Sequence, residues 1–156
     1  MKIIFSSLAL LLMAFSCKKE DVKPDSTNTK ALEEKKELLC SRSWRYASKV
    51  LTIDSVGVID NLMDCEKDDI FMFFNNGQKI SNRGTTFCIN QPNTITDTSR
   101  WEFGPLGTTL LEFTSNSDIE GTYIYQLETL TTDRLVVSVE YVSDGLKNKI
   151  KAEFTH

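Results

Sequence analysis

The sequence predicts an all-β fold: an antiparallel up-and-down β-barrel of about eight strands with a short N-terminal helix. From Arg42 onward, apolar and polar residues alternate with period two, which is typical of strands buried on one face. Turn sequences such as Asn75-Asn76-Gly77 and Ser143-Asp144-Gly145 separate these segments at hairpin length. Little helix is left to cover a flat sheet, and closure into a barrel removes exposed sheet edges.

Composition excludes several functions. The chain has 156 residues, with 18 basic and 22 acidic side chains, and its single histidine is His156. A Ser-His-Asp triad, a Cys-His pair and a multi-histidine metal site are therefore not expected. The acidic balance argues against a nucleic-acid partner, because phosphate binding needs clustered lysine and arginine. Since the chain also lacks nucleophile-elbow, phosphate-loop and zinc-spacing motifs, we expect a non-catalytic protein without cofactor or metal.

The first 16 residues are typical of a signal peptide. Lys2 supplies a positive start, and residues 3–16 carry no charge. As a helix this run is about 21 Å long, short of the roughly 30 Å of a bilayer core. Met13-Ala14-Phe15-Ser16-Cys17 resembles a bacterial lipobox, which implies cleavage before Cys17 and acylation of Cys17, for example with palmitate. The alternative is an ordinary secretory signal that ends near a cysteine.

Residues 17–30 are expected to be the lipidated cysteine and a flexible tether. Val22 is the one apolar side chain in residues 18–30, so this segment cannot bury enough surface to fold. Lys18-Lys19-Glu20-Asp21 resembles the export signal of surface lipoproteins in Bacteroidota. That resemblance implies an outer-membrane lipoprotein of the cell envelope, exposed at the surface. A charged tail facing the periplasm is the alternative.

Residues 31–156 are expected to form the barrel domain with its helix. Residues 31–40 favour helix, and Leu32 and Leu39 share the face that would pack on the domain as a lid. Residues 70–74 are apolar on both faces, which predicts a strand beneath that lid or another cover. The candidate strands are residues 44–53, 58–63, 70–75, 78–82, 85–90, 100–103, 108–114, 122–127, 135–142 and 146–154.

A family resemblance supports the barrel. The order of landmarks is Trp44 after a short helix, Cys65 with a following acidic run, Cys88, and then Trp101. This order resembles the lipocalin-like domain of Bacteroidota lipoproteins over residues 38–156. The resemblance implies an eight-stranded up-and-down barrel.

Four cysteines divide into separate roles. If Cys17 is acylated, Cys40, Cys65 and Cys88 remain, and an exported chain favours one bridge and one free thiol. We expect Cys65 to pair with Cys88, since they flank the aromatic strand and its hairpin. Bridges from Cys40 to either of them are the alternatives. The carboxylates of residues 64–69 lack the spacing of an EF-hand, and we expect a solvated loop rather than a calcium site.

Two functions are compatible with these features. The first is a barrel that binds a small apolar or amphipathic ligand, because eight strands enclose room for one small ligand or for the barrel's own side chains. The alternative is a surface lipoprotein with a filled barrel that contacts a protein or glycan, for example through apolar residues near Ile95 or Leu106. The candidate ligand-lining residues are Trp44, Trp101, Phe103, Phe113, Tyr123, Tyr125 and Tyr141.

Overall fold

The structure is a computed structural model that describes residues 26–54, 57–89, 96–116 and 119–156. The predicted signal peptide, Cys17 and most of the predicted tether lie outside these ranges. The strands are β1 (Ser43–Ile53), β2 (Gly57–Asp60), β3 (Ile70–Phe73), β4 (Gln78–Asn82), β5 (Thr96–Phe103), β6 (Thr109–Asn116), β7 (Ile119–Leu130), β8 (Leu135–Ser143) and β9 (Leu146–Thr155).

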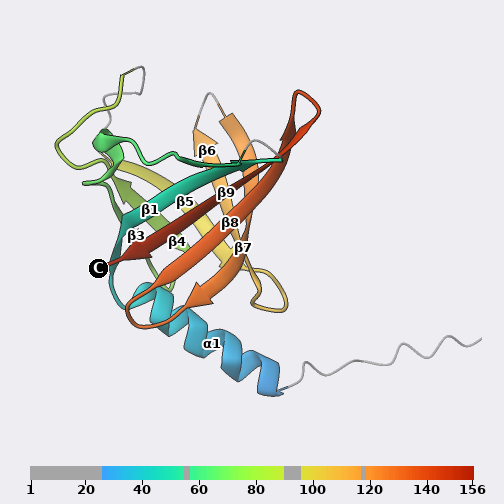
Figure 1. Cartoon of the computed structure of the whole chain (residues 1–156). Coiled ribbons are helices and arrows are strands. Elements are labelled where there is room, and N and C mark those ends of the chain that lie inside the picture. Colours follow the sequence, from blue (N-terminus) through green and yellow to red (C-terminus); the bar gives the residue numbers. More distant parts are fainter. Residues whose placement is uncertain (1–25, 55–56, 90–95, 117–118) are drawn as a thin grey trace, which may run out of the picture.

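Eight of these strands close into an antiparallel barrel, as the sequence predicts (Figure 1). β1 and β3 to β9 follow one another around the barrel, and β9 pairs with β1 to complete it. β2 stands outside this ring and pairs with the last residues of β1, from Val50 to Ile53. The second half of β1 therefore has a neighbour on each side, and few strand edges are left open to solvent.

Helix α1 (Ser26–Cys40) lies across one end of the barrel (Figure 1). The fully buried Trp44 donates its indole N–H to the Leu39 carbonyl at 2.9 Å. Lys35 donates to the Gly107 carbonyl at 2.7 Å, on the turn between β5 and β6. The helix begins five residues before the predicted start, because each residue added to an existing helix gains a hydrogen bond at little further cost.

The predicted strand at residues 85–90 is wrong over residues 85–89; Asn90 lies outside the described residues. The backbone N–H groups of Thr85 and Thr86 donate to an Asp68 carboxylate oxygen, at 2.7 and 3.1 Å, instead of to a neighbouring strand. These residues therefore form a loop around a carboxylate. β5 is longer than predicted because its first residues, from Thr96 to Ser99, are polar and carry no apolar alternation.

The predicted disulfide between Cys65 and Cys88 is confirmed, with a Cα–Cα distance of 5.2 Å. It joins the short 3₁₀ helix η1 (Asp64–Glu66) to the loop after β4. Cys40 is a free, half-buried thiol at the end of α1, and burial raises its pKa. Figure 1 shows η1, in green, at the end of the barrel opposite α1, and the bridge lies there with it.

Removing the bridge is expected to cost about 3 kcal/mol of stability, because it closes a loop of about 24 residues in the unfolded chain. The double variant Cys65→Ser/Cys88→Ser and the reduced wild-type protein should both unfold at lower urea concentration than the oxidised protein. Cys40→Ser is the control and should keep the oxidised midpoint. Equal midpoints with and without reductant would contradict this expectation.

The core occupies the helix end of the barrel. Phe73 and Phe103 each meet the Trp101 ring edge-on, with centroids 5.6 and 5.4 Å apart. β3, the strand that is apolar on both faces, contacts α1, as expected for a strand beneath the lid. The buried apolar cluster consists of Leu39, Trp44, Phe73, Trp101, Leu110, Leu135, Val137, Ala152 and Phe154.

Candidate ligand cavity

Part of this core, including Val137 and Ala152, also lines a cavity of about 270 Å³ inside the barrel. One wall is apolar and comes mainly from β8 and β9, with Val137, Val139, Ile150 and Ala152. The remaining wall comes from β1, β3, β4, β6 and β7 and carries charged and aromatic side chains. They are Tyr46, Lys49, Phe71, Phe73, Lys79, Glu112, Tyr123 and Tyr125.

Lys79 and Glu112 form a buried ion pair in this wall. The Lys79 ammonium donates to both Glu112 carboxylate oxygens, at 2.7 and 2.8 Å. The two side chains are 13% and 12% exposed, and the Ser99 hydroxyl donates to the same carboxylate at 2.8 Å. The ammonium also lies 5.2 Å from the centre of the Phe71 ring, within the range of a cation–π contact.

Lys49 and Glu66 form a second buried pair nearer the open end. The Lys49 ammonium donates to both carboxylate oxygens at 2.5 Å and lies 5.5 Å from the centre of the Tyr46 ring. Glu66 also accepts the backbone N–H of Met63 at 3.0 Å. The pair therefore connects η1 and the disulfide to the wall of the cavity.

A β-bulge explains why Lys49 points into the barrel. The pairing between β1 and β9 shifts between Tyr46 and Ser48, so that Tyr46 opposes Phe154 and Lys49 opposes Ala152. Both of these partners line the cavity. Without the bulge, strict alternation from Tyr46 would place Ser48 inside and Lys49 outside.

The cavity opens at the end opposite α1. Tyr123 opposes Glu112 on the neighbouring strand and so faces the interior, yet it is 40% exposed. Tyr46 and Tyr125 lie deeper, and burial raises the pKa of both, with the Glu66 and Glu112 carboxylates respectively adding to the effect. Their hydroxyls therefore stay protonated at neutral pH and can donate a hydrogen bond to a ligand.

The seven aromatic residues predicted to line a ligand site are divided by the fold. Tyr123 and Tyr125 line the cavity, with ring centroids 6.3 Å apart. Trp44 and Trp101 belong to the core at the helix end, and Phe103 packs against it. Phe113 opposes Arg100 on the outer face of the barrel, and Tyr141 lines a groove on the β8–β9 hairpin.

Several cavity residues carry no clear sequence signal for their position. Lys79 lies in a mostly polar strand. Glu112 is followed by the apolar Phe113, and a pattern based on hydrophobicity would place Phe113 inside the barrel and Glu112 outside. A signal for Lys49 does exist. The apolar positions of β1 change phase, from Trp44 and Tyr46 to Leu51 and Ile53, and such a change indicates a bulge between them.

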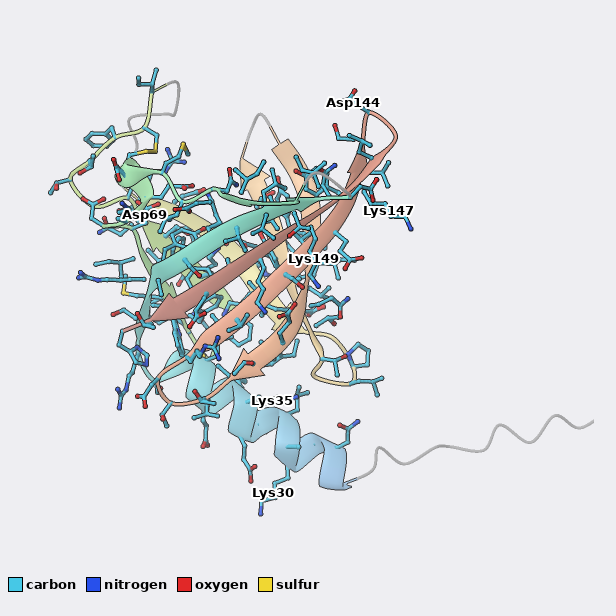
Figure 2. All side chains as sticks on the ribbon, viewed as in Figure 1. Lys30, Lys35, Asp69, Asp144, Lys147 and Lys149 are labelled. Carbon is cyan, nitrogen blue, oxygen red and sulfur yellow. A yellow bond between two sulfur atoms is a disulfide. The ribbon has the colours of Figure 1, made fainter. Side chains whose placement is uncertain are left out.

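The carboxylates of residues 64–69 lie toward the end of the barrel opposite α1, where Figure 2 shows Asp69. Burial raises the pKa of Asp69 to about 6, and repulsion from Glu66 and Asp68 adds to the shift. One of its oxygens is buried without a hydrogen-bond partner among the described residues. In Asp68, hydrogen bonds led by the Thr85 N–H lower the pKa. Within the described ranges, no three His, Cys, Asp or Glu side chains are grouped to hold a metal ion.

Asp69→Asn is expected to stabilise the protein near neutral pH. Because the pKa of Asp69 is about 6 in the folded state and about 3.8 unfolded, the folded protein holds an extra proton between about pH 4 and 6. The stability contributed by this group is therefore largest at about pH 4 and falls as the pH rises through 6. Thermal melts should show the variant above wild type near neutral pH, with the gap closing toward about pH 4.

The matched variant Asp64→Asn should show no such gain. Its hydrogen bond with Lys67 lowers the pKa of Asp64, so the charged carboxylate is the favoured form in the folded protein. If the melting temperature of Asp69→Asn differed from that of wild type by the same amount at every pH, the raised pKa assigned to Asp69 would be contradicted.

The fold and this site define a small closed β-barrel with an internal cavity that is apolar on one side and polar on the other. Comparison with known proteins finds no matching family and no matching curated sequence. Across the described residues, no helix has both the length and the apolar character to cross a membrane.

Proposed function

We propose that the protein is a lipid-anchored lipoprotein of the cell envelope whose barrel binds a small amphipathic ligand without catalysis. The observation that supports this is the cavity of about 270 Å³, open at the end opposite α1. Ligand sites are mostly apolar and contain a few polar groups that orient the ligand. The β8–β9 wall supplies the apolar surface, and Lys49, Lys79 and the tyrosine hydroxyls supply the polar groups.

The proposed anchor is Cys17, carrying acyl chains in the outer membrane. Two or more chains hold a protein stably at a membrane. Residues 18–25 lie between Cys17 and the start of α1 and span at most about 26 Å when extended. Because α1 covers the closed end of the barrel, this attachment directs the open mouth away from the membrane, toward the cell exterior if the charged residues 18–21 act as the export signal.

Ligand binding is tested with the neutral fluorescent probe N-phenyl-1-naphthylamine. Ala152→Leu places a larger side chain in the cavity wall, and Ala31→Leu is a matched change on the exposed face of α1. We expect saturable binding to wild type and to Ala31→Leu, and at least about tenfold weaker binding to Ala152→Leu. Absence of saturable binding, or equal binding by the two variants, would count against the proposal.

Anchoring is tested separately by labelling with a palmitate analogue in a bacterial host that processes lipoproteins. Wild type should be labelled and recovered with the outer membrane, and Cys17→Ser should be unlabelled and released. Label that persists in Cys17→Ser would overturn Cys17 as the anchor without affecting the ligand site.

The second candidate function is contact with a protein or glycan through exposed side chains at the rim of the barrel, at the end opposite α1. Exposed apolar side chains mark interaction surfaces when they cluster. Several exposed apolar side chains lie on β2 and on the two loops that the disulfide joins. Of the two residues named from the sequence, Leu106 is 72% exposed but lies near α1, and Ile95 lies outside the described residues. The exposed rim residues are Val58, Ile59, Met63, Phe87 and Ile89. A barrel that fails to bind the probe would favour this candidate.

A further inference from the structure

Both lysines of the cavity wall already have a counter-ion. Lys79 is held by the two oxygens of Glu112, and Lys49 by the two oxygens of Glu66. All four side chains are no more than 14% exposed. Glu66 does not itself line the cavity, but with its charge counted the two ion pairs sum to zero, and each positive group lies beside a negative one.

A carboxylate ligand would have to compete with these glutamates. Displacing Glu112 from Lys79 would leave a buried carboxylate whose remaining described partner is the Ser99 hydroxyl. A buried charge that loses its counter-ion is strongly unfavourable. Sharing Lys79 instead would bring two carboxylates together in a poorly hydrated site, where like charges repel strongly.

A neutral acceptor meets neither obstacle. A lysine ammonium has three N–H donors, and two of those on Lys79 go to the Glu112 oxygens. The third is left for a ligand hydroxyl or carbonyl, which would accept it without disturbing the ion pair. The apolar chain of such a ligand would lie against Val137, Val139 and Ile150 on the other wall.

The size of the cavity limits the chain. Its volume of about 270 Å³ lies near the lower end of the roughly 300–1,000 Å³ typical of small-molecule sites. The cavity therefore suits a compact aromatic molecule or a medium-chain amphipath better than a long-chain lipid.

On this basis we infer that the cavity selects small neutral amphipaths, such as medium-chain alcohols and esters, over the corresponding carboxylates. This inference rests on the proposed ligand-binding function. It names the chemical class of the ligand and assigns Glu66 and Glu112 as the residues that exclude anions by occupying the two lysines.

The test compares 1-octanol with octanoate as competitors of N-phenyl-1-naphthylamine near neutral pH. For wild type we expect octanol to bind at least about tenfold more tightly than octanoate. Because any apolar cavity prefers the less hydrated molecule, the deciding measurement is the variant Glu112→Gln, which leaves Lys79 without its anion. Octanoate should bind this variant at least about tenfold more tightly than wild type, while octanol binding changes little.

Glu153→Gln is the matched control, since Glu153 pairs with Arg134 on the outer face of the barrel at 2.7 Å. It should leave both affinities unchanged. Glu66→Gln, which frees Lys49, is the second variant if Glu112→Gln does not fold, and it should raise octanoate affinity in the same way.

The outcomes separate the two proposals. Octanoate binding as tightly as octanol to wild type, or failing to gain affinity in the folded glutamine variant, overturns the selectivity while ligand binding stands. If the probe and both competitors fail to bind wild type, the proposed function fails, and this inference fails with it.

Discussion

Trp44→Ala is expected to lower the free energy of unfolding by about 4 kcal/mol, the largest effect of any single substitution considered for the core. Trp44 is fully buried, and its indole N–H is bonded to the Leu39 carbonyl, so it joins the barrel to α1. Its ring also contacts His156 at a centroid distance of 4.4 Å. Removing it leaves a cavity between lid and barrel, and α1 loses the indole hydrogen bond to its Leu39 carbonyl.

Urea denaturation followed by circular dichroism measures this effect. Leu106→Ala, at a side chain that is 72% exposed, is the control and should change stability by less than about 0.5 kcal/mol. Trp44→Phe keeps a ring but removes the donor, and the unpaired Leu39 carbonyl should cost about 1 to 3 kcal/mol. Equal stability of Trp44→Ala and Leu106→Ala would contradict the role assigned to the lid contact.

Glu112→Leu is expected to cost about 3 to 5 kcal/mol, because Lys79 would remain buried without its anion. Its cation–π contacts with Phe71 and Phe73 replace only part of the lost attraction. The double variant Lys79→Met/Glu112→Leu should recover to within about 1 kcal/mol of wild type, or exceed it, since two apolar side chains of similar size need no counter-ion.

A double-mutant cycle measures the coupling between the two side chains. Single and double variants are unfolded in urea, and the interaction energy is the deviation of the double variant from the sum of the singles. Additive costs would show that the pair is not buried together as described. The corresponding outer pair, Arg134 with Glu153, is half-exposed on its arginine side and should show coupling of about 1 kcal/mol or less.

Local chemistry made much of the strand pattern predictable. β4 has the bounds expected from the sequence, because the Asn-Gly turn before it defines its start. The segment at residues 85–89 was predicted as a strand from its composition, yet its N–H groups go to Asp68, a residue 17 positions earlier in the chain. A hydrogen bond of that separation has no local signature, so the error could not be found in the segment's own sequence.

The candidate site was less predictable, because hydrophobicity identifies core residues better than cavity residues. Aromatic content pointed to Trp44, Trp101 and Phe103, which fill the helix end, and to Phe113, which lies outside. Glu112 faces inward because the β5–β6 register sets it opposite Trp101. Register is a relation between strands, and neither strand specifies it alone.

The sequence was sufficient for the all-β class and for the turns that separate most strands, because these depend on residue type and spacing. It favoured the Cys65–Cys88 bridge but left bridges from Cys40 open, and the tertiary structure decided between them. Only the tertiary structure decided which side chains share the interior of the barrel. One bulge after Tyr46 reverses the faces of β1 and carries Lys49 inside, where the β9 pairing holds it against the cavity. The two lysines of that wall are neutralised by glutamates 17 and 33 residues away in the chain, which closure of the barrel brings within hydrogen-bonding distance.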